Sequence, residues 1–281
     1  MPFRSRNWRL RSIKKRESGR QRKIFASLFL RGVVRNIKLV LEYDGSTFFG
    51  FQKQPLHPTI QEALEKALSI FFRHKMKIAA ASGRTDAGVH AEGQVVNFRT
   101  ASAEPIAKIQ RGLNALLPQS IVVSGIEEVP QDFHARYSIK SKIYEYRIWN
   151  HPYRSPLIAG RAFHVPFHLN ISSMRRAAKL LTGKHDFRSF TSPSAIKKMN
   201  ISFVRTVKRF LVKKQGYLIL FHVEADGFLY HMIRNMVGTL LEVGRGKRTP
   251  GSIAEVLKAK DRRFAGMAVP SEGLTLIEVT Y

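Results

Sequence analysis

A short glycine-rich stretch, GRTDAGVHA, carries an arginine, an aspartate and a histidine close together. These are Arg84, Asp86 and His90, with Gly83 and Gly88 among them. Glycine permits positive φ and lets another group approach the backbone closely. Apolar runs flank the stretch, so two strands can hold the loop while it aims a carboxylate outward, and loops of this kind often carry function. The Asp-Ala-Gly sequence also suits an ordinary turn, so this pattern leaves both interpretations open.

A second group of polar residues lies in an otherwise apolar segment. His231, Arg234, Asn235 and Gly238 follow the spacing i, i+3, i+4 and i+7, which is one stripe of an α-helix. Such a stripe is commonly a solvated face. This one, however, contains no Lys or Glu, and apolar residues fill the remaining faces. A nearly buried helix with a single arginine needs a carboxylate partner, and Asp86 is the candidate.

Two further patterns have weaker chemical meaning. The segment KIYEY places Tyr144 and Tyr146 on the same face of a strand, where tyrosines more often belong to a core than to an active site. His164 and His168 are four residues apart, but Pro166 interrupts the helix that would bring them together. We therefore expect no zinc site.

Composition narrows the class of protein. The 281 residues include 48 Lys and Arg against 20 Asp and Glu, a formal net charge of +28. This excess predicts a polyanionic partner, most simply nucleic acid. The chain contains no cysteine, which excludes disulfides, cysteine zinc sites and thiol nucleophiles. No apolar run approaches the roughly 18 residues of a membrane span, so no membrane association is expected.

The N-terminal segment is the most basic part of the chain. Residues 1–38 hold 13 Lys or Arg and one acidic residue, Glu17. Its composition fits a disordered RNA-binding arm, an organellar transit peptide, or an upstream start-site artefact. We favour a disordered arm over residues 1–35, and hence a cytoplasmic protein with organellar targeting as the alternative.

Hydrophobic periodicity predicts an α+β fold. In the first half, strands are expected over 37–43, 76–81, 94–99 and 121–129, and helices over 60–71 (capped by Thr59) and 105–116. In the second half, strands are expected over 143–149, 203–212, 217–225 and 274–280, and helices over 171–181, 228–243 (capped by Asp226) and 253–259.

Each half thus follows the order β-α-β-β-α-β of the ferredoxin-like split motif. We expect a disordered extension (1–35) followed by two tandem ferredoxin-like halves, 36–137 and 138–281. Their antiparallel sheets should flank a basic central cleft.

At this point the sequence resembles a known family. GRTDAGVHA (83–91) is similar to the active-site loop of the tRNA pseudouridine synthase A (TruA) family, and the resemblance runs from about residue 36 to the end. Six other landmarks occur in the expected order: EYDGSTFFGFQ (42–52), FHAR (133–136), YEYRIWN (144–150), HDFRSF (185–190), HMIRNMVG (231–238) and EGLTL (272–276).

The resemblance implies a homodimer that isomerises uridine to pseudouridine at positions 38, 39 and 40 of the tRNA anticodon stem-loop, without cofactor or metal. It assigns Asp86 as the nucleophile, Arg234 as its ion-pair partner, and Tyr144 as the residue that stacks on the target base and serves as an acid or base. It further implies that Arg84 assists extrusion of the base and that Leu274 lines the pocket. Whether Asp86 attacks the uracil ring or the sugar is left open.

The chain departs from the family pattern in three places. Phe51 replaces a common tryptophan, Ile143 stands where a basic residue is frequent, and the N-terminal extension is unusual. These departures concern contacts to tRNA. The alternative function is a non-catalytic RNA-binding module or RNA chaperone built from two RRM-like sheets. Strand 94–99 lacks the RRM aromatic string, and Asp86, which a degenerate synthase would be expected to lose, is present. The sequence therefore favours an enzyme.

Overall fold

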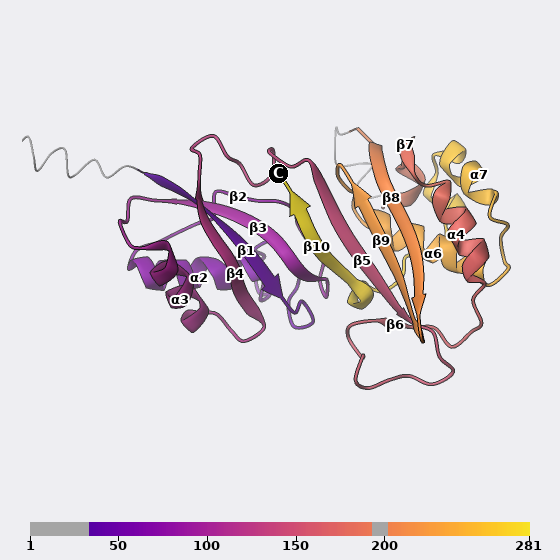
Figure 1. Cartoon of the computed structure of the whole chain (residues 1–281), viewed down its shortest axis with the longest axis horizontal. Coiled ribbons are helices and arrows are strands. Elements are labelled where there is room, and N and C mark those ends of the chain that lie inside the picture. The colour runs from indigo at the N-terminus through magenta and orange to yellow at the C-terminus, as the bar shows by residue number, and fades with distance from the viewer. Residues whose placement is uncertain (1–33, 193–201) are drawn as a thin grey trace, which may run out of the picture.

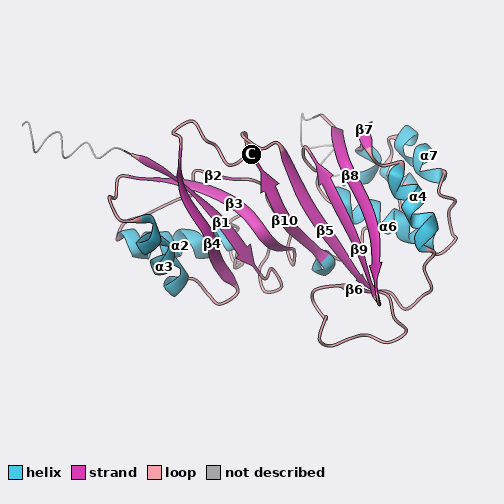
Figure 2. Ribbon diagram, viewed as in Figure 1, coloured by secondary structure: helices cyan, strands magenta, loops and turns pink. Residues whose placement is uncertain are grey.

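The computed structural model describes residues 34–192 and 202–281. Nearly all of the expected N-terminal arm lies outside the described residues. The strands form one long, mostly antiparallel sheet in the order β4-β1-β3-β10-β5-β9-β8-β7 (Figure 1). Helices α2 and α3 pack at one end of this sheet, and α4, α6 and α7 pack at the other (Figure 2). The α+β class and the mostly antiparallel sheet expected from the sequence are confirmed.

The first half of the chain has the ferredoxin-like strand order β4-β1-β3-β2. Its elements are β1 (Arg35–Tyr43), α2 (Ile60–Phe72), β2 (Ala80–Ala81), β3 (His90–Thr100), α3 (Ile106–Leu116) and β4 (Ile121–Val129). Alternate side chains of β1, including Ile37, Leu39 and Leu41, are fully buried. Thr59 caps α2, as the sequence predicts, because its side chain accepts a hydrogen bond from the Glu62 N–H.

The second half repeats this order as β10-β5-β9-β8. Its main elements are β5 (Ser141–Trp149), α4 (Ile171–Lys179), β8 (Val204–Gln215), β9 (Leu218–Ala225), α6 (Met232–Gly244), α7 (Ser252–Ala259) and β10 (Leu274–Thr280). Two short strands that the sequence did not predict are added, β6 (Phe163–His164) beside β5 and β7 (Gly183–Asp186) beside β8. No described helix is long and apolar enough to cross a bilayer.

The C-terminal strand joins the two halves. β10 pairs antiparallel with β5 and, through Thr275 opposite His90 and Leu276 opposite Ala91, parallel with β3. It therefore runs through the middle of the molecule, shown in yellow (Figure 1). The antiparallel sheets expected for the two halves are joined edge to edge into one continuous sheet. The division at residue 137 remains a prediction, since β10 bonds to strands of both halves.

Two elements differ from their predicted bounds, and local hydrogen bonds explain why. Only Ala80–Ala81 of the expected strand 76–81 is strand, because side chains of α2 take backbone donors there: Met76 N donates to Ser69 Oγ and Ile78 N to Glu65 Oε1. In the second half, α6 begins at Met232 rather than 228. Asp226 does not cap it, since its Oδ1 accepts from Thr206 N and extends the β8–β9 pairing instead.

Candidate active site

The loop that carries Asp86 rests on the turn that follows β1. Phe51 N donates to Thr85 O over 3.0 Å, and Gly88 N donates to Phe48 O over 3.3 Å. Gly50 has φ +86, and a Cβ there would lie 2.7 Å from Thr85 O. Glycine is therefore required at position 50 both by its own conformation and by the approach of the loop.

Buried polar side chains hold the two ends of the loop. Tyr43 Oη and Thr85 Oγ1 are 2.8 Å apart in a buried hydrogen bond. Gln94 Nε2 donates to Gly83 O over 2.9 Å, and Ser82 Oγ donates to Gln94 Oε1. Burial raises the pKa of Tyr43, so its hydroxyl stays neutral and remains a hydrogen-bonding group. The loop is thus preorganised by β1 and β3.

His90 has a structural position. Its Nδ1 accepts from Gly45 N over 3.2 Å, so the proton lies on Nε2, which donates to Gly160 O over 2.8 Å. His90 is 3% exposed and does not line the cleft described below. It connects the turn after β1 to the long segment between β5 and β6, rather than acting on a substrate.

The structure brings Asp86 and Arg234 together. Arg234 Nη1 lies 3.3 Å from Asp86 Oδ2. The guanidinium is fixed from behind, because Arg234 Nε donates to Val269 O over 2.8 Å. His231 Nε2 approaches the same Oδ2 to 3.4 Å. The polar stripe of α6 is therefore not a solvated face: its first turn faces the aspartate, and Asn235 is buried with Nδ2 donating to Phe190 O.

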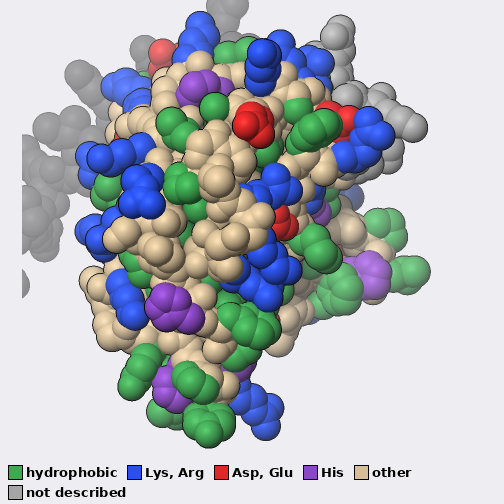
Figure 3. All heavy atoms as spheres, turned by 90° about the vertical axis from the view of Figure 1, so that its right-hand side faces the viewer, with side chains coloured by type: hydrophobic (Ala, Val, Ile, Leu, Met, Phe, Trp, Pro, Cys, Tyr) green, Lys and Arg blue, Asp and Glu red, His purple; other side chains and the backbone are tan. Residues whose placement is uncertain are grey.

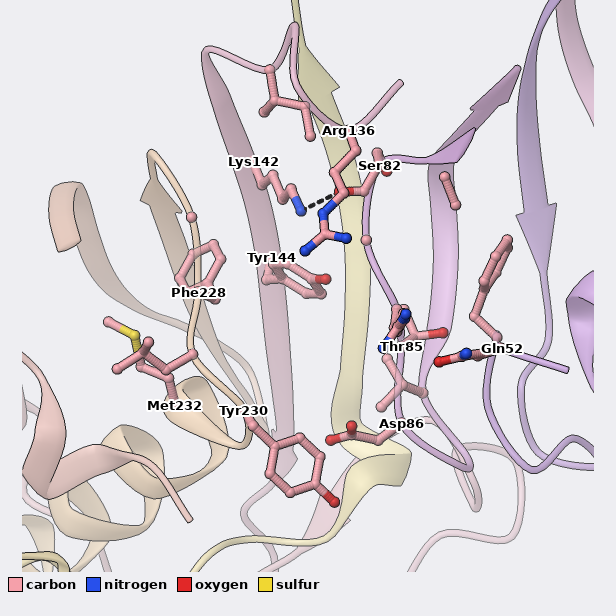
Figure 4. Close-up of a pocket in the computed structure, with 18 of the residues that line it drawn as sticks. Gln52, Ser82, Thr85, Asp86, Arg136, Lys142, Tyr144, Phe228, Tyr230 and Met232 are labelled. Carbon is pink, nitrogen blue, oxygen red and sulfur yellow. Dashed lines mark hydrogen bonds between the residues drawn. The ribbon is translucent and has the colours of Figure 1, made fainter. Parts of the chain in front are cut away.

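Tyr144 lies on β5, one strand away from the loop across β10. It is 8% exposed, and its ring meets Phe228 edge-on with centroids 5.2 Å apart. Figure 4 shows Tyr144 between Phe228 and the Asp86 loop, with Tyr230 beneath. Burial, and then the nearby Tyr43 and Asp86, raise the pKa of Tyr144, so its hydroxyl is protonated at neutral pH and can donate a proton or hydrogen bond. Leu274, at the start of β10, is buried and lines the same cleft.

The cationic residues of the site occupy the cleft walls. Arg84 is exposed at the edge. Lys142, on β5, donates from Nζ to Ser82 O over 2.5 Å, the contact marked by a dashed line in Figure 4. Burial, and then the charge of Arg136, lower the pKa of Lys142 to about 8. Sequence reasoning missed Lys142, Arg136 and Arg205, although Lys142 lies only two residues before Tyr144.

These residues surround a cleft of about 1380 Å³ between the two halves. Five Lys or Arg line it, against two aspartates, Asp86 and Asp226. The apolar part includes Phe51, Phe228, Met232 and Leu274. Within residues 34–192 and 202–281, no three His, Asp or Glu side chains cluster as metal ligands would. An apolar pocket with an ion-paired carboxylate and a cationic rim fits a substrate that combines a flat base with phosphates.

A continuous sheet of two ferredoxin-like repeats, with an aspartate loop facing a basic cleft, fits an enzyme of the class that acts on nucleic acid. A family model described as tRNA pseudouridine synthase matches residues 39–138 and 177–281. The chain belongs to the tRNA pseudouridine synthase family.

Curated relatives match most of the chain. This chain is 44% identical over 248 residues to "tRNA pseudouridine synthase A 2" of Clostridium perfringens, and the match covers 88% of this chain and 100% of the relative. It is 42% identical to "tRNA pseudouridine synthase A" of Acetivibrio thermocellus, with the same coverage. For the enzyme of that name from Geobacillus kaustophilus the identity is 44%, over 89% of this chain and 95% of the relative.

Proposed function

We propose that this protein isomerises uridine to pseudouridine in tRNA, at positions 38, 39 and 40 of the anticodon stem-loop. The observation that carries the proposal is the Asp86–Arg234 ion pair inside the basic cleft of a chain that belongs to the synthase family. In this reaction the N1–C1′ bond breaks and a C5–C1′ bond forms. N1 gains a proton and C5 releases one.

Asp86 is the nucleophile in this proposal. An ion pair with Arg234 requires the carboxylate to be ionised, which is the reactive form. Among the described residues, the side-chain contacts of Asp86 all involve Oδ2. The other oxygen, Oδ1, therefore keeps its lone pairs for attack on the uridine. Arg234 supplies charge compensation without occupying that oxygen.

The cleft walls suit a uridine that has left its helical stack. Base flipping costs a few kcal/mol, which favourable contacts in the pocket must offset. Tyr144 offers a ring for stacking and a protonated hydroxyl, and Leu274 closes the apolar side, so that a detached uracil stays in place. In this proposal Arg84, which is exposed at the rim, enters the space that the base vacates.

Charge supports tRNA as the polyanion. β8 exposes Lys208, Arg209, Lys213 and Lys214, and the end of the molecule that carries this half shows many Lys and Arg and few acidic side chains (Figure 3). A homodimer, a cytoplasmic location and a reaction without cofactor or metal complete the proposal. The resemblance supports the homodimer and the absence of a cofactor, and the location rests on the interpretation of the N-terminal segment as an RNA-binding arm.

The test is tritium release from tRNA that contains 5-tritiated uridine. Asp86→Asn should keep its fold and its tRNA affinity, because the amide is isosteric, but should release no tritium, because it cannot act as the nucleophile. Asp132→Asn, an exposed acidic residue outside the cleft, is the control and should match wild type. Turnover of Asp86→Asn near the wild-type rate would refute the assignment.

A further inference from the structure

His231 approaches the candidate nucleophile from the position just before α6. Its Nε2 lies 3.4 Å from Asp86 Oδ2, and Arg234, three residues later, reaches the same oxygen at 3.3 Å. His231 is the residue just before α6 and Arg234 lies in its first turn, so the N-terminal end of α6 presents two groups to one oxygen. These contacts involve Oδ2 and leave Oδ1 without either of them.

The backbone at His231 adopts an uncommon conformation to make this approach. His231 has φ 61 and ψ 6, in the left-handed region, where few residues other than glycine occur. Its ring stacks on Tyr230 with centroids 3.9 Å apart and a 24° interplanar angle. Strained backbone conformations persist where the surrounding structure holds them, and they cluster at functional sites. The strain here places an imidazole at the aspartate.

The charges around the imidazole decide its protonation state. Asp86 faces it from the loop before β3, Arg234 from α6, and Arg262 from the 3-10 helix η2 (Arg262–Phe264). Burial disfavours the imidazolium most, Asp86 favours it, and the two arginines disfavour it, so the pKa of His231 lies below its usual value. At neutral pH His231 is therefore an uncharged ring that can donate one N–H.

We propose that His231 is a positioning residue for the reaction: its neutral imidazole, with Nε2 3.4 Å from Asp86 Oδ2, moves closer when the uridine binds, donates to this oxygen and so orients the carboxylate with Oδ1 toward the uridine. The inference rests on the proposed function. A neutral donor orients the carboxylate without adding a second full positive charge. Protonation of His231 would add that charge and reduce the nucleophilicity of Asp86, so the reaction should slow as the ring becomes charged at acid pH.

Two substitutions of His231 separate the effect of its side-chain length from the effect of its backbone conformation. His231→Asn keeps a residue type that tolerates left-handed φ, but its amide is too short to reach Asp86 as Nε2 does. His231→Gln extends an N–H₂ donor to about the position of Nε2, and it does not titrate. His222, whose Nε2 lies 3.2 Å from Glu145 Oε2 outside the cleft lining, provides a matched histidine–carboxylate control.

The experiment measures the single-turnover rate of pseudouridine formation with excess enzyme from pH 5 to 8, together with tRNA affinity and the thermal unfolding midpoint. His231→Asn should react roughly tenfold more slowly at pH 7, the effect of one lost hydrogen bond, with unchanged tRNA affinity. His231→Gln should recover most of the rate, and its decline at acid pH should move to lower pH than in wild type. His222→Asn should match wild type throughout.

Three results would overturn the proposal: a wild-type rate in His231→Asn, an equal loss in both His231 variants, or an unchanged acid limb in His231→Gln. A change confined to the unfolding midpoint would show a structural role only and would overturn it as well. A wild-type enzyme that forms no pseudouridine would instead refute the proposed function. An active wild type with unaffected variants would refute only the role of His231.

Discussion

Lys142 shows how a single residue can make substrate binding depend on pH. Removing an ammonium group from water disfavours its charged form. Its Nζ donates to Ser82 O, directly before the loop that carries Asp86, and Arg136 adds a like charge nearby. With a pKa of about 8, Lys142 is mostly charged at neutral pH and loses its charge in mildly alkaline solution. A phosphate entering the cleft would stabilise the protonated form.

We therefore predict that tRNA affinity falls as pH rises from 7 to 9. Above a pKa of about 8 the neutral amine of Lys142 must take up a proton in order to bind phosphate as an ammonium, and this proton uptake costs affinity. Lys142→Met should bind more weakly at pH 7 and lose most of this pH dependence, as filter binding across the range would show. Lys140→Met, an exposed neighbour outside the cleft, should keep it. An equal pH dependence in both variants would exclude Lys142 as the titrating group.

At the scale of elements, the position of α6 determines whether Arg234 reaches Asp86. The helix packs closely on residues 265–269: Val269 N donates to Arg234 O, Arg234 Nε donates to Val269 O, and Gly266 N donates to Thr239 Oγ1. Gly238 permits this approach, since a Cβ there would lie 1.8 Å from Met267 O. The glycine of the polar stripe therefore has a packing role.

Gly238→Ala should separate α6 from this segment. A methyl group at that distance from a backbone oxygen forces the helix to move, so we expect the free energy of unfolding to fall by about 1–3 kcal/mol. Activity should fall further than tRNA affinity, because Arg234 moves with the helix. Gly251→Ala is the control: a Cβ there meets only Thr249 Oγ1 at 4.0 Å, and its effect should stay within roughly 1 kcal/mol. Denaturant unfolding of both variants provides the comparison, and equal stability would contradict the packing argument.

At the scale of the whole molecule, the continuous sheet and the net positive charge both serve the cleft. The sheet positions its side chains, and the charge attracts a polyanion to it. The continuous sheet holds the Asp86 loop and Tyr144 on strands separated only by β10. The net charge of +28 draws a polyanion toward the cleft from any direction. Residues 1–33 contribute 11 of the Lys and Arg, and their predicted role as an RNA-binding arm remains a prediction.

Deleting residues 1–33 should weaken tRNA binding at low salt and flatten the dependence of log affinity on log salt. Each phosphate that the segment neutralises contributes roughly 0.7 to 0.9 to that slope. The deletion should stop before Arg35, because its Nη1 donates to Ser102 O and Glu104 O within the fold. The modified positions and the rate at saturating tRNA should not change. Binding with an unaltered salt slope would show that the segment does not contact RNA, and would favour targeting or a misassigned start.

The sequence alone determined the parts of this protein whose signals are contiguous. The loop GRTDAGVHA, the capped helix after Thr59 and the basic composition each lie within a short window, so family, substrate class and most elements follow from local patterns. The solitary arginine of α6 also predicted its carboxylate partner, because an enclosed guanidinium needs a compensating charge.

Only the tertiary structure decided how these parts meet. The joining of two sheets depends on the pairing of Thr275 with His90 and Leu276 with Ala91, residues far apart in the chain whose register no local periodicity encodes. The late start of α6 also depends on tertiary contacts. Asp226 extends the β8–β9 pairing and residues 226–231 line the cleft, and these contacts override their helical pattern. His231 reaches Asp86 only because of that delay. The periodicity of apolar residues specifies which face of an element is buried, whereas the packing of the whole chain decides which of these faces contact each other.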